Sequence, residues 1–495
     1  MSDADPEHLD VLIVGAGLSG IGAAIRLQAG DPSLRLAIFE GRDAIGGTWD
    51  LFRYPGVRSD SDMATLGFPF RPWRGARAIV EGGDIRDYIV DTARAFDVER
   101  HVRLRHRVRR ADWSSATARW TVEYEVDGTA RRVSCAFLFG CTGYYDYAAG
   151  HAPERPGMTA FGGEIVHPQF WPAAQQVAGR RVVVIGSGAT AVTLVPALVA
   201  RGAAHVTMLQ RSPTYIVSQP ARSPLDATLR RRLPARVADV AIRWKSIALT
   251  SVFYGLARRR PAIVRRQIAA AQRAALGPGF DMAHLTPRYD PWDQRLCLVP
   301  DNDLFDALRA GRAAIVTDRI AHFTAYGIAL ESGSELPADL VVSATGLKVL
   351  MMGGIALAVD GAPVDVGARL LFRGAMLDGV PNFAFSVGYT NASWTLKSDL
   401  TARFVSRLLR HMKRRGWASV QAVVPAGEQS DAPLFALDAG YVRRAAATLP
   451  RQGRRAPWRV RQNYLLDLLG FHTTRLAAPL RFGKVRPGAQ GAGPE

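Results

Sequence analysis

Two glycine-rich loops, each directly after an apolar run, constrain the fold of this chain more than any other feature. The first reads Gly-Ala-Gly-Leu-Ser-Gly at residues 15–20, and the second reads Gly-Ser-Gly-Ala-Thr-Ala at residues 186–191. A segment of helical composition and then another apolar run follow each loop, which is the strand, turn, helix and strand order of a doubly wound parallel sheet. We therefore expect an α/β chain with two Rossmann-like dinucleotide-binding domains.

The first loop has all three glycines of the dinucleotide-binding pattern. Gly15 allows the tight turn, Gly17 lets backbone N–H groups approach a pyrophosphate, and Gly20 permits close helix packing. Glu40 ends the apolar run that follows, where a carboxylate can accept hydrogen bonds from a ribose diol. This site suits an adenosine cofactor without a 2′-phosphate, such as FAD or NAD.

The second loop differs from the first in its last residue and in the residue that ends the following apolar run. Ala191 stands in place of the third glycine, and Arg211, followed by Ser212, stands at the position that corresponds to Glu40. A guanidinium pairs with a 2′-phosphate, whereas a carboxylate would repel it, so NADPH is expected here rather than NADH. The alternative is that Arg211 is only a solvated surface charge.

Size and charge limit the class of protein. A chain of 495 residues is expected to form two or three domains, and 48% hydrophobic residues indicate a globular protein. The net charge of +19 favours anionic partners, but it is dispersed and no nucleic-acid motif with interleaved aromatic residues accompanies it. A purely basic binding module would therefore leave most of the sequence unexplained, and we assign neither a nucleic-acid site nor a metal site.

The three cysteines are spread along the chain, at Cys135, Cys141 and Cys297. None forms a C-x-x-C pair, so a disulfide framework and a disulfide reductase are both disfavoured. A reducing cytoplasm is the expected location. The acidic first residues do not resemble a signal peptide, so we expect the mature chain to start near Met1.

The expected domains follow from the two loops. Residues 1–150 are expected to form the first part of an FAD-binding domain, and 151–340 a linker and an NADPH-binding domain with a helical insertion at 225–276. Residues 341–482 are expected to return to the FAD-binding domain, and 483–495 to be a disordered tail. Runs 120–126 and 325–330 are expected to be small antiparallel inserts beside the crossings between domains.

The run 246–257 is the most apolar part of the helical insertion, and basic residues flank it. It is far shorter than the roughly 20 residues that a membrane-spanning helix needs. Two interpretations stay open: an amphipathic helix that lies on a membrane surface, and a helical cap within the fold.

A second pair of glycines, Gly46 and Gly47, precedes Thr48 and Trp49. Paired glycines allow close approach to a flat ring system, and Asp60 further along brings a carboxylate near the same place. The alternative for Asp60 is a purely local role, capping a helix that begins at residue 61.

The stretch between the two loops identifies the family. Its residues Phe161, Gly163, His167, Trp171 and Pro172 match the Phe-x-Gly-x-x-x-His-x-x-x-Trp-Pro fingerprint, and the chain resembles the Baeyer-Villiger type of class B flavoprotein monooxygenases. The related N- and S-oxygenases usually carry another aromatic residue at the tryptophan. Similar segments at 46–73, 291–295 and 388–394 extend the resemblance from about residue 10 to residue 464.

The resemblance implies roles for particular residues. Arg295 would be the active-site arginine and Asp60 its carboxylate partner, although Asp293-Gln294-Arg295 departs from the commoner Lys-Arg-Pro setting. His167 would hold the linker during domain movement rather than transfer protons, and Trp394 would border the site or pack in the core. The expected FAD-binding residues are Gly15, Gly17, Ser19, Gly20, Glu40, Gly47, Thr48, Trp49, Asp60 and Val108. The expected NADPH-binding residues are Gly186, Ser187, Gly188, Ala189, Thr190, Ala191, Arg211 and Ser212.

The implied reaction uses NADPH and O₂ to insert oxygen into ketones, giving esters or lactones, with oxidation of sulfides and thioamides beside it. The alternative is a flavin-containing N- or S-oxygenase whose substrate is not a ketone. The expected partners are a small ketone or sulfur compound and O₂. Peripheral association with the inner face of the cell membrane is possible, and the oligomeric state stays open.

Overall fold

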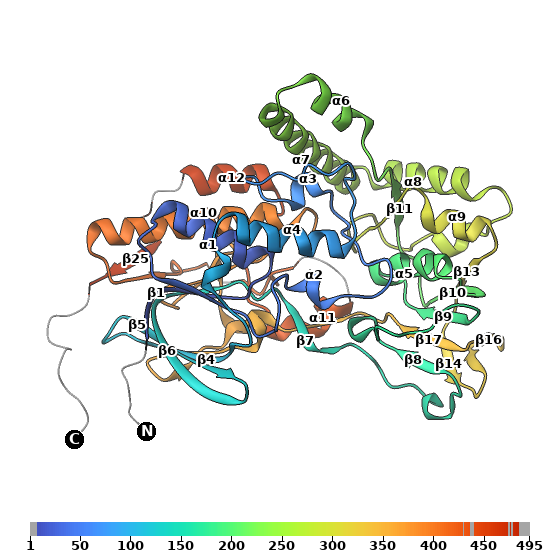
Figure 1. Cartoon of the computed structure of the whole chain (residues 1–495), viewed down its shortest axis with the longest axis horizontal. Coiled ribbons are helices and arrows are strands. Elements are labelled where there is room, and N and C mark those ends of the chain that lie inside the picture. Colours follow the sequence, from blue (N-terminus) through green and yellow to red (C-terminus); the bar gives the residue numbers. More distant parts are fainter. Residues whose placement is uncertain (1–6, 429, 436–439, 474–475, 477–478, 485–495) are drawn as a thin grey trace.

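The structure of the protein is a computed structural model that describes residues 7–428, 430–435, 440–473, 476 and 479–484. Two sheets with parallel strands lie side by side, one built from both ends of the chain and the other from its middle (Figure 1). The chain leaves the first sheet, completes the second and then returns to the first. The predicted class, α/β with two doubly wound sheets, is confirmed.

The first sheet has a parallel centre that is buried on both faces. Alternate residues of its central strand contribute to two separate apolar cores, Val11 and Ile13 to one and Leu12 and Val14 to the other. This is the pattern of a parallel sheet covered on both sides. The parallel strands are β1 (His8–Val14), β2 (Leu36–Phe39), β3 (Val102–Arg103), β6 (Thr129–Gly140) and β23 (Phe383–Phe385).

A mostly antiparallel extension continues this sheet beyond β6. Its strands are β4 (Arg107–Ser114), β5 (Arg119–Val126), β19 (Ala356–Val359) and β20 (Ala362–Pro363), and within it β19 and β4 pair in parallel. The run 120–126 is therefore not a separate insert, because the long strand β6 pairs with β5 along its first half and with β1 along its second. One strand thus joins the antiparallel and parallel parts into a single nine-stranded sheet.

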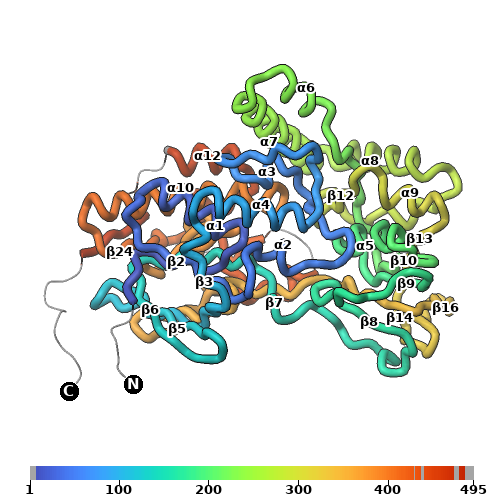
Figure 2. The backbone as a smooth tube through the Cα atoms, in the orientation of Figure 1, coloured from blue at the N-terminus to red at the C-terminus, as the bar shows by residue number. Residues whose placement is uncertain are grey.

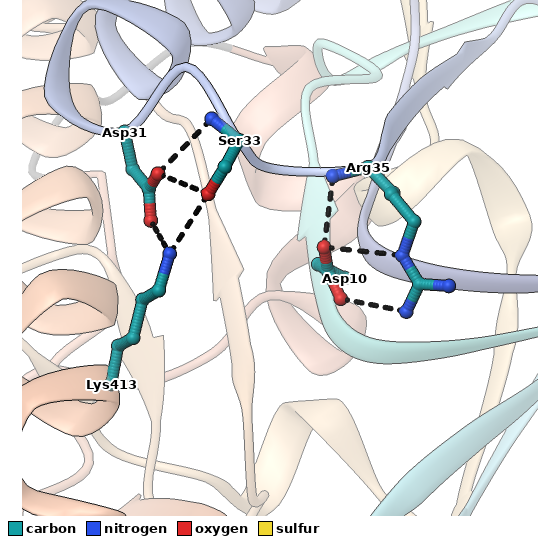
Figure 3. A network of polar contacts seen from close by, with 5 residues as sticks. All are labelled: Asp10, Asp31, Ser33, Arg35 and Lys413. Atoms are coloured by element: carbon teal, nitrogen blue, oxygen red, sulfur yellow. Dashed lines mark hydrogen bonds and ion pairs between the residues drawn. The ribbon is translucent and has the colours of Figure 1, made fainter.

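Three helices cover one face of the first sheet: α1 (Leu18–Gly30), α4 (Gly82–Ala95) and α10 (Trp394–Arg415). Near the C-terminal end of α10, Lys413 Nζ lies 2.6 Å from Asp31 Oδ2 and 2.9 Å from Ser33 Oγ, just after α1 ends (Figure 3). Beside them, Arg35 pairs with Asp10 at 3.1 Å. These contacts tie residues from opposite ends of the chain together at one rim of the domain.

The second sheet is wholly parallel, with strand order β13-β10-β9-β17-β8. These strands are β8 (Glu164–Val166), β9 (Arg181–Ile185), β10 (His205–Gln210), β13 (Ala313–Thr317) and β17 (Leu340–Ser343). Helices α5 (Ala189–Ala200) and α9 (Asp303–Arg309) pack against it. A small antiparallel sheet lies beside it: β14 (Ile320–Phe323), β15 (Gly327–Leu330) and β16 (Glu335–Pro337).

Two boundaries differ from the expectation. The return to the first domain does not begin at residue 341, because β17 runs to Ser343 and pairs with both β8 and β9 in the second sheet. The expected tail does not begin at 483 either, because Gly483 ends strand β25 (Leu480–Gly483), which pairs with β24 (Ser419–Ala422). Residues 485–495 lie outside the described residues.

The segments that cross between the two domains pair with each other. Strand β7 (Tyr145–Gly150) leads toward the second sheet, and β18 (Leu347–Val349) leads back in antiparallel order. Asp146 on β7 and Lys348 on β18 form an ion pair at 3.1 Å. The two connections therefore form one short ribbon between the domains.

The helical insertion leaves and rejoins the second domain through a pair of parallel strands, β11 (Ile216–Gln219) and β12 (Cys297–Pro300). Between them lie α6 (Pro224–Arg232), α7 (Ala235–Arg259) and α8 (Pro261–Leu276). The chain trace shows α6 and α7 rising from the body of the molecule (Figure 2). Within the described part of the chain, no helix is long and apolar enough to cross a membrane.

Candidate functional site

A cavity of about 520 Å³ runs from the first glycine-rich loop to the start of α5, which follows the second loop. It therefore lies between the two domains, at the carboxyl ends of the parallel strands, where open α/β sheets bind their ligands. The predicted site residues that line it are Gly15, Gly17, Ser19, Glu40, Gly47, Thr48, Trp49, Asp60, Val108, Ala189, Thr190 and Arg295.

The first loop is shaped so that only glycine fits at its critical positions. Gly15 has φ +107°, and a Cβ added at Gly20 would lie 1.8 Å from the Gly15 carbonyl oxygen. Gly47, which precedes helix α2 (Thr48–Leu51), has φ +57°, and a Cβ there would lie 2.9 Å from Gly17 Cα. The two glycine turns thus pack directly against each other, and both line the cavity with backbone that a pyrophosphate could approach.

Glu40 forms part of the cavity wall and braces the loop from the end of β2. Its Oε2 accepts a hydrogen bond from the Ala16 N–H at 2.8 Å, and its Oε1 accepts one from the Arg42 N–H at 3.0 Å. Burial raises the pKa of Glu40 above its ordinary value. Each carboxylate oxygen keeps a second acceptor position, which is what a ribose diol requires.

Trp394 also belongs to the cavity wall, at the first turn of α10. Its Nε1 donates to Ser19 Oγ at 2.9 Å, and its ring stacks on Tyr144 with centroids 5.2 Å apart. Of the two expectations for Trp394, the structure favours a place at the edge of the site. Through its hydrogen bond to Ser19, Trp394 also links the first loop to the C-terminal part of the chain.

Arg295 and Asp60 meet in the cavity although they are far apart in sequence. Arg295 Nε lies 2.9 Å from Asp60 Oδ2, and Arg295 Nη2 donates to Asp60 Oδ1 at 3.2 Å, so the contact is bidentate. Asp60 raises the pKa of Arg295 above its ordinary value, which keeps the guanidinium charged at every working pH. The structure therefore places a fixed cation beside Asp60 in the cavity wall, which Arg42, Arg58 and Arg107 also line.

Asp60 has no capping role. The short helix α3 (Met63–Leu66) is capped instead by Asp62, whose side chain accepts from the Thr65 N–H at 3.0 Å. Two residues before Asp60, Arg58 binds Asp303 of the second domain at 2.5 and 3.3 Å. The loop that carries Asp60 is thus anchored across the domain boundary.

Sequence reasoning missed three tyrosines that line the cavity: Tyr144, Tyr145 and Tyr147. The Tyr144 and Tyr145 hydroxyls lie 3.0 Å apart, and burial raises the pKa of both phenols. Burial also raises the pKa of Tyr147 to about 12. All three hydroxyls are therefore neutral at physiological pH. Their position directly after β6 was the available signal, because the carboxyl ends of parallel strands face the ligand.

The second loop has the same tight geometry at its start and is more open afterwards. Gly186 has φ +139°, and a Cβ there would lie 2.4 Å from the Ala344 carbonyl oxygen. Ala191 is buried in the core of the second domain, whereas Gly188 and Ala189 are exposed where α5 begins. Ser187 is partly buried beside them.

Arg211 and Ser212 are both exposed, directly after β10. Among the described residues, Arg211 makes no hydrogen bond or ion pair through its side chain. A free guanidinium at the carboxyl end of the second strand is what a 2′-phosphate would need.

His167 lies in the linker and not in the cavity. Its Nδ1 accepts from the Gln169 N–H at 3.2 Å, and its ring packs so closely on β7 that a Cβ at Gly150 would lie 2.1 Å from it. Burial lowers the pKa of His167 below its ordinary value. Gln169 in turn donates to the Asp146 carbonyl at 2.8 Å. These contacts tie the linker to the crossing strand.

Comparison with known proteins agrees with this arrangement. Residues 9–243 match the model of the flavin-binding monooxygenase-like family. The chain is 50% identical to the FAD-containing monooxygenase EthA of Mycobacterium tuberculosis, over 93% of this chain and 95% of that protein. It is 46% identical to the probable FAD-binding monooxygenase AlmA of Acinetobacter baylyi, over 93% of each chain.

Solved structures share the fold. A steroid monooxygenase bound to NADP superposes with a TM-score of 0.70 at 24% identity, covering 84% of this chain and 88% of that one. Cyclohexanone monooxygenase from Rhodococcus sp. Phi1, bound to NADP⁺, has a TM-score of 0.70 at 20% identity, with coverage of 85% and 87%. The chain belongs to the flavin-binding monooxygenase-like family, and the predicted class, a class B flavoprotein monooxygenase, is confirmed.

Proposed function

We propose that this enzyme uses NADPH and O₂ to insert an oxygen atom into ketones, giving esters or lactones, and that it also oxidises sulfides and thioamides. The observation that carries this proposal is the Arg295–Asp60 ion pair in a cavity that joins the two glycine-rich loops. Bound FAD supplies the redox chemistry that activates O₂, with NADPH as the hydride donor.

The residues of the first domain fit FAD. Gly17 and Gly47 line the cavity with backbone and pack too closely for a Cβ at Gly47. Glu40 offers acceptors to a ribose, and Thr48, Trp49 and Asp60 line the same cavity. Val108 closes the same wall from β4. The second loop with Arg211 and Ser212 would hold NADPH, because its free guanidinium can pair with the 2′-phosphate.

Arg295 would stabilise the negative charge that develops on the substrate oxygen during oxygen transfer. A single preorganised donor of this kind contributes about 3 kcal/mol to the transition state. Asp60 holds the guanidinium in place through two contacts, so the cation needs no reorganisation when charge appears. The neutral hydroxyls of Tyr144 and Tyr145 keep the neighbouring wall free of a competing anion.

The test is product identification with two substrates in parallel, a long-chain methyl ketone and a dialkyl sulfide, each with purified enzyme, NADPH and air. The proposal predicts ester from the ketone and sulfoxide from the sulfide, with NADPH consumed in proportion to product. Sulfoxide without ester from any ketone tested would instead identify an N- or S-oxygenase. NADPH consumption matched only by hydrogen peroxide would reject both substrate classes.

We also propose that the enzyme is located in the cytoplasm. The three cysteines are free thiols that lie buried, which suits a reducing compartment.

A further inference from the structure

One face of α7 exposes apolar side chains where a water-facing helix should expose polar ones. Between residues 237 and 256, every residue classed as exposed is apolar. These residues are Val237, Val240, Trp244, Ala248, Leu249, Val252 and Leu256, with Leu249 61% and Val252 68% exposed. A contiguous exposed apolar surface of this kind marks a contact site for another molecule.

The opposite face of α7 is firmly held by the protein. Arg243 Nη1 donates to the carbonyls of Ala64 and Gly67, each at 2.8 Å. Asp239 binds Arg74 at 3.0 Å, and Lys245 pairs with Asp226 of α6. Because Asp239, Arg243 and Lys245 are engaged on the protein side, the apolar face of α7 between residues 237 and 256 is directed outward by the fold.

Helix α12 (Tyr464–Thr473) continues the apolar surface. Tyr464 lies beside Trp244 of α7, with ring centroids 6.3 Å apart, and both helices lie along the same rim of the molecule (Figure 1). Leu465, Leu466 and Leu469 of α12 are 42%, 45% and 61% exposed. The apolar surface therefore spans two helices from opposite domains.

Basic residues border this surface. Residues 221–276 contain thirteen Lys and Arg against two Asp, and both aspartates are ion-paired. Exposed arginines stand at both ends of α7: Arg231, Arg232 and Arg236 precede the apolar face, and Arg258, Arg259 and Arg260 follow it. Two of these basic residues, Arg258 and Arg265, pair with Asp293 and Asp290, and the segment that carries α7 still keeps a strong excess of positive charge.

We propose that α7 and α12 form a docking surface for an anionic lipid bilayer, with α7 lying in the plane of the membrane surface. Apolar side chains would enter the boundary between head groups and acyl chains, and the flanking arginines would pair with lipid phosphates. A second copy of this chain fits less well, because it would bring two arginine-rich borders together. The inference does not depend on the proposed reaction.

The test is cosedimentation of the purified full chain with vesicles of phosphatidylcholine alone and of phosphatidylcholine with phosphatidylglycerol. We expect binding to the anionic vesicles only, and we expect it to fall steeply as NaCl is raised from about 0.05 to about 0.5 M, because salt screens the arginines. The variant Leu249→Glu/Val252→Glu should lower the partition coefficient at least tenfold. Arg231→Ser/Arg232→Ser/Arg236→Ser should lower it roughly a hundredfold, at about fivefold for each arginine.

Two matched controls carry the same changes elsewhere. Leu104→Glu/Tyr326→Glu replaces exposed apolar residues, and Arg131→Ser/Arg201→Ser/Arg312→Ser removes the same charge from other elements. Both controls should bind within about twofold of wild type, and all variants should keep the NADPH oxidation rate measured without vesicles.

Three results would overturn the proposal: no binding to anionic vesicles, equal binding to neutral ones, or equal losses in the controls. A wild-type dimer that Leu249→Glu/Val252→Glu converts to a monomer would assign the surface to a second copy of the chain.

Discussion

Replacing Arg295 by alanine removes the cation that pairs with Asp60 in the cavity wall. The two contacts to Asp60, at 2.9 and 3.2 Å, are lost with it. If Arg295 supplies about 3 kcal/mol of transition-state stabilisation, ester formation should slow roughly a hundredfold. FAD binding should be unchanged, because the glycine turns and Glu40, which holds the first turn through Ala16, keep their contacts when Arg295 is replaced.

The assay separates the two halves of the reaction. Reduction of the bound flavin by NADPH is followed anaerobically, and ester and hydrogen peroxide are quantified separately in air. Arg295→Ala should keep the reduction rate within about threefold while ester is replaced by peroxide. Arg295→Lys keeps the charge but loses the bidentate contact, so its rate of ester formation should lie between those of the wild type and Arg295→Ala.

A double-mutant cycle tests whether the pair acts as a unit. Asp60→Asn should slow ester formation less than Arg295→Ala, and adding it to Arg295→Ala should cost little more, because residues in contact are not additive. Coupled ester formation by Arg295→Ala at close to the wild-type rate would refute the electrostatic role.

Three further perturbations have defined outcomes. Arg211→Ala should lower the preference for NADPH over NADH, measured as the ratio of kcat/KM values, at least tenfold, because a charge-assisted pair with the 2′-phosphate is lost. An unchanged ratio would mean that Arg211 is only a solvated surface charge. Gly47→Ala places a Cβ 2.9 Å from the opposing loop and should yield protein with little FAD, whereas Gly83→Ala, where no atom lies within 4 Å, should keep full FAD content. Asp31 has its pKa lowered to about 2 by Lys413 and Ser33, so its stabilising effect is present above pH 3.8 and is lost as the pH falls toward 2. Asp31→Asn should therefore lower the free energy of unfolding by about 1 kcal/mol at pH 7, a value reduced for solvent screening, and equal losses at pH 2 and pH 7 would contradict this.

Local chemistry explains which parts of the fold could be predicted. The loops at 15–20 and 186–191 have glycines that geometry requires, and the contact of Glu40 with the first loop follows from strand order alone. The pairing of β5 with β6 was harder to anticipate, because a twelve-residue strand can serve two neighbours in different directions.

The site, too, has contacts that could be predicted from the sequence and contacts that could not. The meeting of Arg295 and Asp60 was expected from the family resemblance, whereas Arg58 and Asp303, which anchor the same loop across the domains, carry no local signature. The cap of α3 shows the limit of local reasoning. The sequence alternative had Asp60 cap a helix beginning at residue 61, whereas in the structure Asp60 pairs with Arg295 and Asp62 caps α3, which begins at Met63.

The origin of the inserted oxygen tests the proposed reaction most directly. The purified enzyme is incubated with NADPH, ¹⁸O₂ and a long-chain methyl ketone, and the product is analysed by mass spectrometry. We expect an ester that carries one ¹⁸O atom, in the oxygen that links its acyl and alkyl parts, in an amount that matches the NADPH consumed, with the second ¹⁸O atom released as water. Recovery of unchanged ketone while NADPH is consumed and labelled hydrogen peroxide accumulates would contradict it.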